Sequence, residues 1–464
     1  MIRIFNAYFP TRTLLLVFTE TVVAFCALIG ATYVLYGGDS TILLFYENGV
    51  LRIGIVCAIC VLCIYYYDLY NSLVISSTRE VVTKLVQVVG TTCIILAVLY
   101  YLYPAIQIRT GLFVPAVLFM GICLIGWRRV FAIVNRSQRL AERAIILGDG
   151  PLVLPLSKEI ENRPELGFRV VGFVGDPNVS MNGLSRLGAI DEIGEVAAER
   201  KIERIIVTMG ERRGKLPVEK LLNMKMKGVM IEDGNAFYET LTGKVALESL
   251  RPSQLLFSTG FFASRGMLIT KRLLSVALSL VALVITAPVM LVVALAILID
   301  SGRPVLFRQK RVGKDGRIFT LYKFRSMKIE GNVNAAGNGK AQPAKSNDER
   351  FTRTGRMIRR LRVDELPQLY NILKGDMYFV GPRPFMLEEE EQLSLQIPFY
   401  KQRWAVKPGV TGWAQINRPY CVTLEDNLEK LSYDLFYVKN MSVGLDMLIL
   451  FQTAKTLLLR RGSR

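Results

Sequence analysis

An adjacent pair of carboxylates, Asp364 and Glu365, follows the most basic part of the chain, and the run 364–384 reads DELPQLYNILKGDMYFVGPRP. Residues 300–362 hold 17 Lys and Arg against 5 Asp and Glu, a net charge of +12. Asp and Glu can form covalent phosphoryl intermediates, and phosphoryl transfer needs Mg²⁺, Arg or Lys to neutralise charge. The pattern therefore predicts a site where one carboxylate attacks phosphorus and the other holds a metal ion. Arg383, in a Gly-Pro-Arg-Pro turn, is suited to bidentate phosphate contact.

The chain has no histidine among its 464 residues. This absence excludes Ser–His and Cys–His catalytic pairs and every metal site that needs an imidazole ligand. Six of the seven cysteines lie in apolar segments, where a thiol behaves as a small apolar side chain. The cysteines therefore indicate neither disulfides nor an oxidising compartment.

Four apolar segments, each near the roughly 20 residues that span a bilayer, precede the basic region. They are Thr13–Tyr36, Leu51–Leu69, Val82–Tyr103 and Leu112–Ile133. Basic residues lie before the first segment, around the start of the third and after the fourth, whereas the first loop is acidic. Because positive charge stays on the cytoplasmic side, we expect the N-terminus and the chain after the fourth crossing to be cytoplasmic.

A fifth apolar segment, Met267–Ile299, is also long enough to span a bilayer. Pro288 lies near its middle, and basic residues flank both of its ends. A proline interrupts helical hydrogen bonding, and two basic flanks favour the same membrane surface for both ends. We therefore predict a re-entrant helix that enters one leaflet, breaks at Pro288 and returns. A plain spanning helix is the alternative, and it would separate the basic block from cytosolic nucleotides.

Between residues 144 and 250, short apolar runs alternate with polar helical stretches. The runs AIILG, VVGFVG, IIVTM and VMIED resemble buried strands, and the alternation predicts a small Rossmann-like α/β domain. Gly148 and Gly150 follow the first run, but Val153 stands where the third glycine of a GxGxxG phosphate loop would be. The pattern leaves open whether this domain binds a nucleotide or has a folding or regulatory role.

From Lys271 to the C-terminus, five blocks occur in an order typical of one family. They are Gly302–Pro304 with Phe307–Gly313, Tyr322–Met327, Asp364–Pro384, Lys407–Gln415 and Tyr433–Val438. In these blocks the chain resembles the catalytic domain of the bacterial polyprenyl-phosphate sugar phosphotransferases, the large monotopic phosphoglycosyl transferases. The four apolar segments and the Rossmann-like region are similar to the N-terminal half of that family's larger members, including those of exopolysaccharide synthesis.

The resemblance implies transfer of a sugar-1-phosphate from a UDP-sugar to undecaprenyl phosphate, with release of UMP. It implies an aspartyl-phosphosugar intermediate and Mg²⁺ as the cofactor. Asp364 is then the nucleophile and Glu365 its partner, and both lie at the metal. The other residues carried over are predicted to bind phosphate or the nucleotide sugar: Arg383, Arg325, Lys323, Arg311 and Gln415.

Two positions keep a second interpretation. A structural turn that packs an aromatic side chain is the alternative for Pro408–Trp413. Ser275 stands where the family usually has an acidic residue, so the contact of that acid with nearby basic residues is in doubt here.

The expected fold is a membrane α region plus α/β domains. It comprises four transmembrane helices in a bundle (1–136), a degenerate Rossmann-like cytosolic domain (137–263), a re-entrant membrane helix (264–300) and an α/β catalytic domain (301–464). We expect the bacterial inner membrane as the location, with the catalytic domain on its cytoplasmic face. The expected partners are undecaprenyl phosphate, a UDP-sugar and membrane lipids, and a homodimer is suggested. Nucleic acid is not expected as a partner, because the chain has no nucleic-acid-binding motif.

Two other functions compete with the transferase. A membrane-anchored nucleotide-sugar dehydratase would need an intact glycine motif and a Tyr-x3-Lys pair in the Rossmann-like region. The pair Tyr370 and Lys374 lies outside that region. A scaffold without catalysis, which recruits polysaccharide enzymes to the membrane, is the other alternative.

Overall fold

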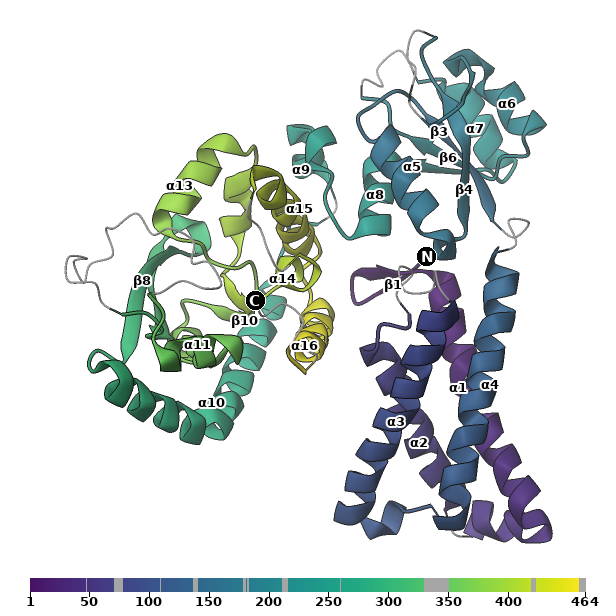
Figure 1. The fold of residues 1–464 in the computed structure, drawn as a ribbon. Helices are drawn as coiled ribbons and strands as arrows, with labels where there is room; N and C mark the ends of the chain where they lie inside the picture. The colour runs from purple at the N-terminus through teal and green to yellow at the C-terminus, as the bar shows by residue number, and fades with distance from the viewer. Residues whose placement is uncertain are drawn as a thin grey trace. The chain divides into compact units, whose positions relative to one another are not determined.

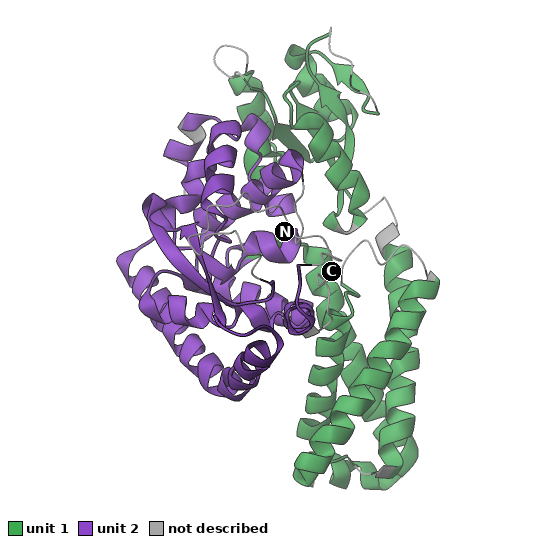
Figure 2. Ribbon diagram, turned by 60° about the vertical axis from the view of Figure 1, so that its left-hand side comes forward, with its two compact units in different colours: residues 1–3, 8–237 green, residues 4–7, 238–464 purple. Residues whose placement is uncertain are grey.

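The computed structural model describes residues 1–46, 48–70, 78–108, 110–136, 141–177, 181, 183–210, 216–258, 260–328, 350–418 and 423–458. Contacts between residues divide the chain into two compact units (Figure 2), residues 1–3 with 8–237 and residues 4–7 with 238–464. Both units have hydrophobic clusters of their own. The division falls inside the predicted 137–263 domain, whose residues from Tyr238 onward pack with unit 2.

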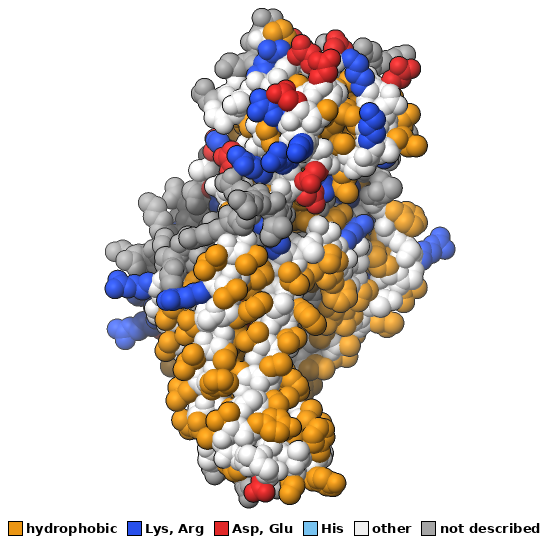
Figure 3. Space-filling view, turned by 90° about the vertical axis from the view of Figure 1, so that its right-hand side faces the viewer, with side chains coloured by type: hydrophobic (Ala, Val, Ile, Leu, Met, Phe, Trp, Pro, Cys, Tyr) orange, Lys and Arg blue, Asp and Glu red, His pale blue; other side chains and the backbone are white. Residues whose placement is uncertain are grey.

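Four long helices begin unit 1 and confirm the four apolar segments (Figure 1). They are α1 (Thr11–Tyr36), α2 (Gly49–Tyr66), α3 (Thr78–Leu102) and α4 (Thr110–Arg136). All four are long and apolar enough to cross a membrane, and apolar side chains cover the face of these helices in Figure 3. They pack on one another through a shared core of small and branched side chains that includes Ala24, Ile53, Val88 and Met120.

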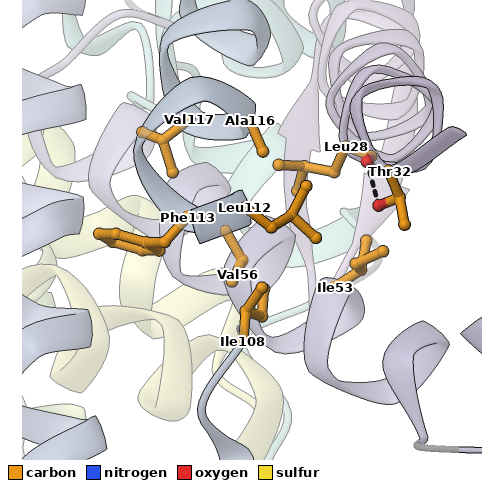
Figure 4. A pocket seen from close by; sticks show the side chains of 9 residues that line it. All are labelled: Leu28, Thr32, Ile53, Val56, Ile108, Leu112, Phe113, Ala116 and Val117. Carbon is orange, nitrogen blue, oxygen red and sulfur yellow. Dashed lines mark hydrogen bonds between the residues drawn. The ribbon is translucent and has the colours of Figure 1, made fainter. Parts of the chain in front are cut away.

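The described residues of the helical part of unit 1 include a buried ion pair and a small pocket. Arg128 of α4 lies 2.5 Å from the Glu20 carboxylate of α1, and its guanidinium also donates to the Leu69 carbonyl at 2.9 Å. Nine side chains line the pocket (Figure 4): Leu28, Thr32, Ile53, Val56, Ile108, Leu112, Phe113, Ala116 and Val117. The one polar side chain among them, Thr32, donates its hydroxyl proton to the Leu28 carbonyl at 2.9 Å. The pocket therefore offers apolar surface and no unpaired polar group.

A five-stranded parallel sheet forms the second part of unit 1. Its strands are β3 (Glu142–Leu147), β4 (Phe168–Val174), β5 (Arg186–Gly188), β6 (Arg204–Val207) and β7 (Met230–Asp233), in the spatial order β5-β4-β3-β6-β7. The neighbouring helices are α5 (Val153–Asn162), α6 (Ile193–Glu199), α7 (Val218–Met226) and α8 (Gly234–Thr242). This order reverses beside the first strand, as in Rossmann-type sheets, and confirms the predicted parallel α/β arrangement. The four predicted runs form β3, β4, β6 and β7, whereas the short strand β5 was not predicted.

Unit 2 is mostly helical around two small sheets (Figure 1). Its helices are α9 (Pro252–Phe257), α10 (Arg265–Ser301), α11 (Arg353–Arg360), α12 (Gln368–Lys374), α13 (Leu387–Gln396), α14 (Trp413–Asn417), α15 (Leu424–Asn440) and α16 (Val443–Leu458). Strands β8 (Leu306–Val312) and β9 (Ile318–Phe324) form an antiparallel hairpin, and β10 (Tyr378–Val380) pairs in parallel with β11 (Gly409–Thr411). The predicted α/β catalytic domain therefore contains little sheet.

Helix α10 is the fifth helix that is long and apolar enough to cross a membrane. The helix assignment is continuous through Pro288, and the ribbon bends into two arms (Figure 1). A straight helix of 37 residues would be about 55 Å long. Both arms nevertheless pack on the rest of unit 2, the first through Ala282 and Leu283 and the second through Val293 and Ile297.

Candidate active site

The carboxylate dyad lies in one tight turn between two short helices. Helix α11 begins at a Thr352 cap, and its buried Ile358 packs against the second arm of α10. Arg362 then takes a left-handed backbone conformation, with φ of 55°, and reverses the chain direction. Asp364 and Glu365 follow in a single 3₁₀ turn, and α12 starts directly afterwards. Packing of the two helices thus holds both carboxylates at a junction.

Glu365 is an ion-paired carboxylate. Its Oε1 atom accepts hydrogen bonds from Arg383 Nη2 at 2.8 Å and from Lys323 Nζ at 3.2 Å. Burial by itself raises the pKa of Glu365, but the positive charges of Arg383 and Lys323 outweigh burial and hold the pKa below its usual range. Glu365 is therefore ionised throughout the physiological pH range and anchors two cations.

Asp364 differs from Glu365 both in its hydrogen bonds and in the direction of its pKa shift. Its carboxylate accepts no hydrogen bond from any residue that the structure describes, although the cations Lys323, Arg359 and Arg383 face it. Burial, and then the negative charge of Glu365, raise the pKa of Asp364 above that of an ordinary aspartate. A partly buried carboxylate of raised basicity, without a bonded partner and amid positive charge, is suited to attack an anionic phosphate.

The cations of the site come from the β8–β9 hairpin and from the turn after β10. Lys323 lies on β9, and Arg311 lies on β8, where it donates to the Pro384 carbonyl at 3.2 Å and to Gln309 at 2.6 Å. Burial, followed by the like charge of Arg383, lowers the pKa of Arg311 to about 10, and burial lowers the pKa of Lys323. Arg311 Nε is also buried without a hydrogen-bond partner among the described residues. The positive charge of these groups exceeds the negative charge around them, and a bound phosphate would supply the missing negative charge.

The Gly-Pro-Arg-Pro turn is close to the strand that pairs with β10. A Cβ atom on Gly409 would lie 2.1 Å from the Gly381 nitrogen, and one on Gly412 would lie 2.2 Å from the Gly381 oxygen. Gly381 donates its N–H to the Thr411 carbonyl at 2.8 Å. The glycines of the Lys407–Gln415 block are therefore needed so that two backbone segments can touch, which places the block beside the turn that carries Arg383.

Two carboxylates form a small ligand set for Mg²⁺. Among the described residues there is no cluster of three or more acidic or thiol side chains that could hold a metal ion. Mg²⁺ is commonly bound by one or two carboxylates together with substrate phosphates, and within the described part of the chain Asp364 has no hydrogen-bonded partner to displace. Asp364 and Glu365 therefore fit a magnesium ion that arrives with a phosphorylated substrate.

Comparisons with known proteins agree with this geometry. Residues 266–460 match the family model for bacterial sugar transferases. The chain is 32% identical to the undecaprenyl-phosphate glucose phosphotransferase of Komagataeibacter xylinus, over 80% of this chain and 69% of that protein. It belongs to the polyprenyl-phosphate sugar phosphotransferase family. It is also 35% identical to the UDP-glucose:undecaprenyl-phosphate glucose-1-phosphate transferase of Escherichia coli, over 71% of this chain and 69% of that protein.

A third relative of this sugar phosphotransferase transfers a different sugar. The chain is 42% identical to the UDP-N-acetylgalactosamine-undecaprenyl-phosphate N-acetylgalactosaminephosphotransferase of Aeromonas hydrophila, over 49% of this chain, and spans about half (52%) of that protein's length. Residues 66–222 match a model described as a CoA-binding domain. In that region a Cβ atom on Gly150 would lie 2.2 Å from the Thr208 oxygen, so this glycine is needed for packing beside β6 whether or not a nucleotide binds.

The hydrogen bonds of Arg325 go to the end of α10. Its side chain is 5% exposed and donates hydrogen bonds to the carbonyls of Ser301, Gly302 and Arg303 and to the Ser301 hydroxyl. Those carbonyls end α10 and have no partner within the helix. Arg325 therefore caps the C-terminal end of α10, and its contact with phosphate stays a prediction.

Gln415 lies beside the active-site turn but has a structural bond. Its Nε2 atom donates to the Val410 carbonyl at 2.9 Å, and its Oε1 atom is buried without a hydrogen-bond partner among the described residues. In the same block Trp413 stacks on Phe436 and donates to the Gly243 carbonyl at 2.9 Å. Trp413 is thus a packed aromatic side chain at the junction between β11 and α14, and contact of Gln415 with a nucleotide sugar stays a prediction.

Ser275 and the residues around it form a contact that the sequence did not reveal. Ser275 accepts a hydrogen bond from the Phe379 amide at 3.2 Å, so it ties α10 to β10. Nearby, Lys271 lies 2.6 Å from Asp446 and also donates to the Tyr437 hydroxyl. Asp446 thus supplies a buried acidic partner for the basic start of α10, and Tyr437 belongs to the Tyr433–Val438 block.

Proposed function

We propose that this protein transfers a sugar-1-phosphate from a UDP-sugar to undecaprenyl phosphate and releases UMP. The proposal rests on the asymmetry of the dyad: Glu365 binds two cations, whereas Asp364 has no hydrogen-bonded partner among the described residues and has Lys323, Arg359 and Arg383 around it. The three relatives named above are undecaprenyl-phosphate sugar phosphotransferases by name, two of them for glucose and one for N-acetylgalactosamine. The transfer would begin the assembly of an exopolysaccharide or a related glycan.

In the proposed reaction an Asp364 oxygen attacks the β-phosphorus of the UDP-sugar. A bond forms between that oxygen and phosphorus, and the bond from phosphorus to the bridging oxygen breaks, so UMP leaves with the electron pair. An oxygen of undecaprenyl phosphate then attacks the same phosphorus and releases the Asp364 carboxylate. No proton is gained or lost in either step, so the absence of histidine is no obstacle.

Each charged residue of the site has a part in this scheme. Arg383, Lys323 and Arg311 bind the phosphate oxygens and stabilise the charge that is shared in the transition state. Glu365 orients Arg383 and Lys323 through the two hydrogen bonds described above. Mg²⁺, held by Asp364 and Glu365 with the substrate phosphates, would neutralise further phosphate charge.

We also propose that α10 is re-entrant and holds unit 2 on the cytoplasmic face of the inner membrane. Both arms pack on the same unit, and Lys271, Arg272 and Arg303 flank the two ends. A spanning helix would instead separate its ends by the roughly 30 Å of the hydrocarbon core. Labelling of single cysteines at Arg265 and Arg303 in sealed inverted vesicles tests this arrangement, since a re-entrant helix exposes both on one side. The suggested homodimer stays a prediction.

The dehydratase alternative is weaker in the structure. Tyr370 and Lys374 lie on α12 of unit 2, whereas the parallel sheet that would hold the dinucleotide lies in unit 1. Lys374 is, moreover, paired with Asp376 at 3.1 Å. The scaffold alternative is separated from the transferase by the activity of the Asp364 variant.

UMP release from a panel of UDP-sugars, with undecaprenyl phosphate and Mg²⁺, tests the proposed reaction. We expect release from one donor, lost when Mg²⁺ is removed and lost in Asp364→Asn. Asp315→Asn is the matched control, because Asp315 is 61% exposed and has a left-handed backbone that Asn also adopts. An active Asp364→Asn enzyme would refute the nucleophile, and no release from any donor would favour the scaffold.

A further inference from the structure

The turn that carries Arg383 lacks some of the backbone N–H groups that usually hold a turn. Pro382 and Pro384 have no N–H, so two of the four residues of this turn cannot donate a backbone hydrogen bond. The carbonyls at this turn accept hydrogen bonds instead. Pro382 accepts from the Gly409 amide at 3.0 Å, and Pro384 accepts from the Arg311 guanidinium at 3.2 Å.

The carbonyl of Arg383 accepts a hydrogen bond from a buried arginine that has no part in the proposed reaction. Arg403, in the 3₁₀ segment Tyr400–Ala405, donates from Nη2 to the Arg383 oxygen at 2.8 Å. Its guanidinium carbon also lies 4.8 Å from the centre of the Phe385 ring. Arg403 therefore contacts the backbone of Arg383, which binds Glu365, and the ring of Phe385, which follows the turn.

Two carboxylates from different helices hold this guanidinium. Arg403 Nη1 lies 2.9 Å from Glu390 Oε1 on α13, and Nη2 lies 2.9 Å from Asp434 Oδ2 on α15. Trp404 donates to the other Glu390 oxygen at 2.9 Å, and Arg403 Nη1 donates to the Tyr400 hydroxyl at 2.8 Å. These groups bind both terminal nitrogens of the guanidinium, and Nη2 is the nitrogen that donates to the turn.

The burial of these charges suggests a purpose other than stability. The side chains of Arg403, Glu390 and Asp434 are each 2–3% exposed. Replacing such a buried ionic group by packed apolar side chains is often neutral or stabilising, because desolvation offsets the attraction between the charges. What an apolar core could not do is donate a hydrogen bond in a fixed direction to the Arg383 carbonyl.

We infer that Arg403, oriented by Glu390 and Asp434, is a positioning residue that fixes the backbone of Arg383 and thereby aims its guanidinium at the substrate phosphate. The part of this inference that concerns the substrate phosphate rests on the proposed function, whereas the part that concerns the backbone of the turn does not. A residue that works through Arg383 should lose its effect when the Arg383 side chain is removed. A residue that only stabilises the domain should keep its effect.

A double-mutant cycle on UMP release tests this dependence. Arg403→Lys keeps the charge but cannot bond to two carboxylates and the carbonyl at once, and we expect a loss of about 10-fold in kcat/KM. Arg383→Ala should cost about 100-fold. We expect the double variant to stay near 100-fold, since the two residues act as one unit. A loss of about 1,000-fold, the product of the two, would overturn the inference.

Arg418→Lys is the matched control. Arg418 also bridges two carboxylates, Asp426 at 3.0 Å and Glu429 at 2.8 Å, but it is 46% exposed and has no hydrogen bond to the turn. It should leave kcat/KM within about twofold of the wild type. An equal loss in this variant would mean that any bridging arginine of the domain matters, which contradicts a specific role for Arg403.

Amide hydrogen exchange provides a readout that does not need turnover. In Arg403→Lys the amides of Arg383 and Phe385 should exchange at least about 10-fold faster, while exchange in α12 stays unchanged. Unchanged exchange at the turn would overturn the inference even if activity falls. If Arg403→Lys does not fold, Asp434→Asn replaces it, because it keeps the shape and removes one of the two orienting charges. If the wild type releases no UMP, the proposed function fails, and exchange still decides the role of Arg403.

Discussion

Two glycine turns that follow parallel strands, one in each unit, look similar in sequence and differ in what surrounds them. Gly148-Asp149-Gly150 follows β3, and Gly381-Pro382-Arg383-Pro384 follows β10. Both need glycine because another backbone is too close. A Cβ atom on Gly150 would lie 2.2 Å from the Thr208 oxygen, and one on Gly381 would lie 2.6 Å from the Lys407 oxygen. Glycine in such a turn is therefore a sign of close packing and not, by itself, of a ligand.

The charges around the two turns are what distinguish them. Arg383 of the second turn pairs with Glu365, and Arg311 binds the next carbonyl. Asp149 of the first turn is exposed and has no ion pair within the part of the chain that the structure describes. A catalytic site is thus indicated where charged side chains from several elements converge, and not by a glycine turn alone.

The largest expected effect is on the nucleophile. Asp364→Asn should lower UMP release by at least about 1,000-fold, because an amide cannot form the acyl phosphate that links the sugar-phosphate to the enzyme. Asp149→Asn, the corresponding change in the first turn, should leave release unchanged. Radiolabelled sugar-phosphate retained on the denatured wild-type protein, and absent from Asp364→Asn, would identify the intermediate. Loss of activity in Asp149→Asn would break the comparison by giving the first turn a catalytic role.

A smaller loss of activity is expected when Arg383 is replaced by a residue that has the same charge but no planar guanidinium. Arg383→Lys should lower kcat/KM by about 10- to 100-fold, because a lysine cannot bind phosphate and Glu365 with a planar fork. Steady-state kinetics over a range of UDP-sugar concentrations measure the effect. A variant with wild-type kcat/KM would show that Arg383 contributes only a positive charge.

Gly150 should affect stability and not catalysis. Gly150→Ala places a methyl group against backbone and should destabilise unit 1 by about 1–3 kcal/mol. Gly194→Ala is the control, since a Cβ atom there meets nothing within 4 Å. Thermal unfolding measures both variants, and activity is compared per folded protein. If Gly150→Ala is as stable as the wild type but inactive, the first turn binds a ligand.

The smallest effect concerns pH. Asp364 must be ionised to attack, and its pKa is raised by burial and by the charge of Glu365, so activity should fall with decreasing pH already above the usual aspartate range. Glu365→Gln removes one of the two causes, so the acid limb of the kcat profile should move to lower pH by up to about one unit. An acid limb that stays in place would mean that Glu365 does not influence the ionisation of Asp364.

Much of the architecture was predictable because it depends on local patterns. Apolar runs of about 20 residues gave the helices α1 to α4, and short branched runs gave four of the five strands of the parallel sheet. The strand β5 was missed, since three residues between turns have no clear periodicity. A re-entrant course with a kink at Pro288 was predicted for α10, and the structure shows a continuous bent helix whose two arms both pack on unit 2.

The site was predictable in part. Asp364, Glu365, Arg383, Lys323 and Arg311 do converge, as their motifs implied. Arg325 was predicted to bind phosphate as well, and its cap on α10 was not predictable, since a basic residue in a motif does not reveal where its side chain points. The role of Arg403 was not predictable from the sequence, because its partners Glu390 and Asp434 lie 13 residues before it and 31 residues after it in the chain.

Composition and local order alone determined that this protein has membrane helices, a parallel α/β domain and a basic region around one acidic dyad. Hydropathy and strand periodicity are properties of neighbouring residues, so they can be read along the chain. Tertiary structure decided which of two adjacent carboxylates is paired and which is not, because that depends on cations from β9 and from the turn after β10. Electrostatic interactions act over a few ångströms in space whatever the separation in sequence, and only the folded chain brings these groups within that distance.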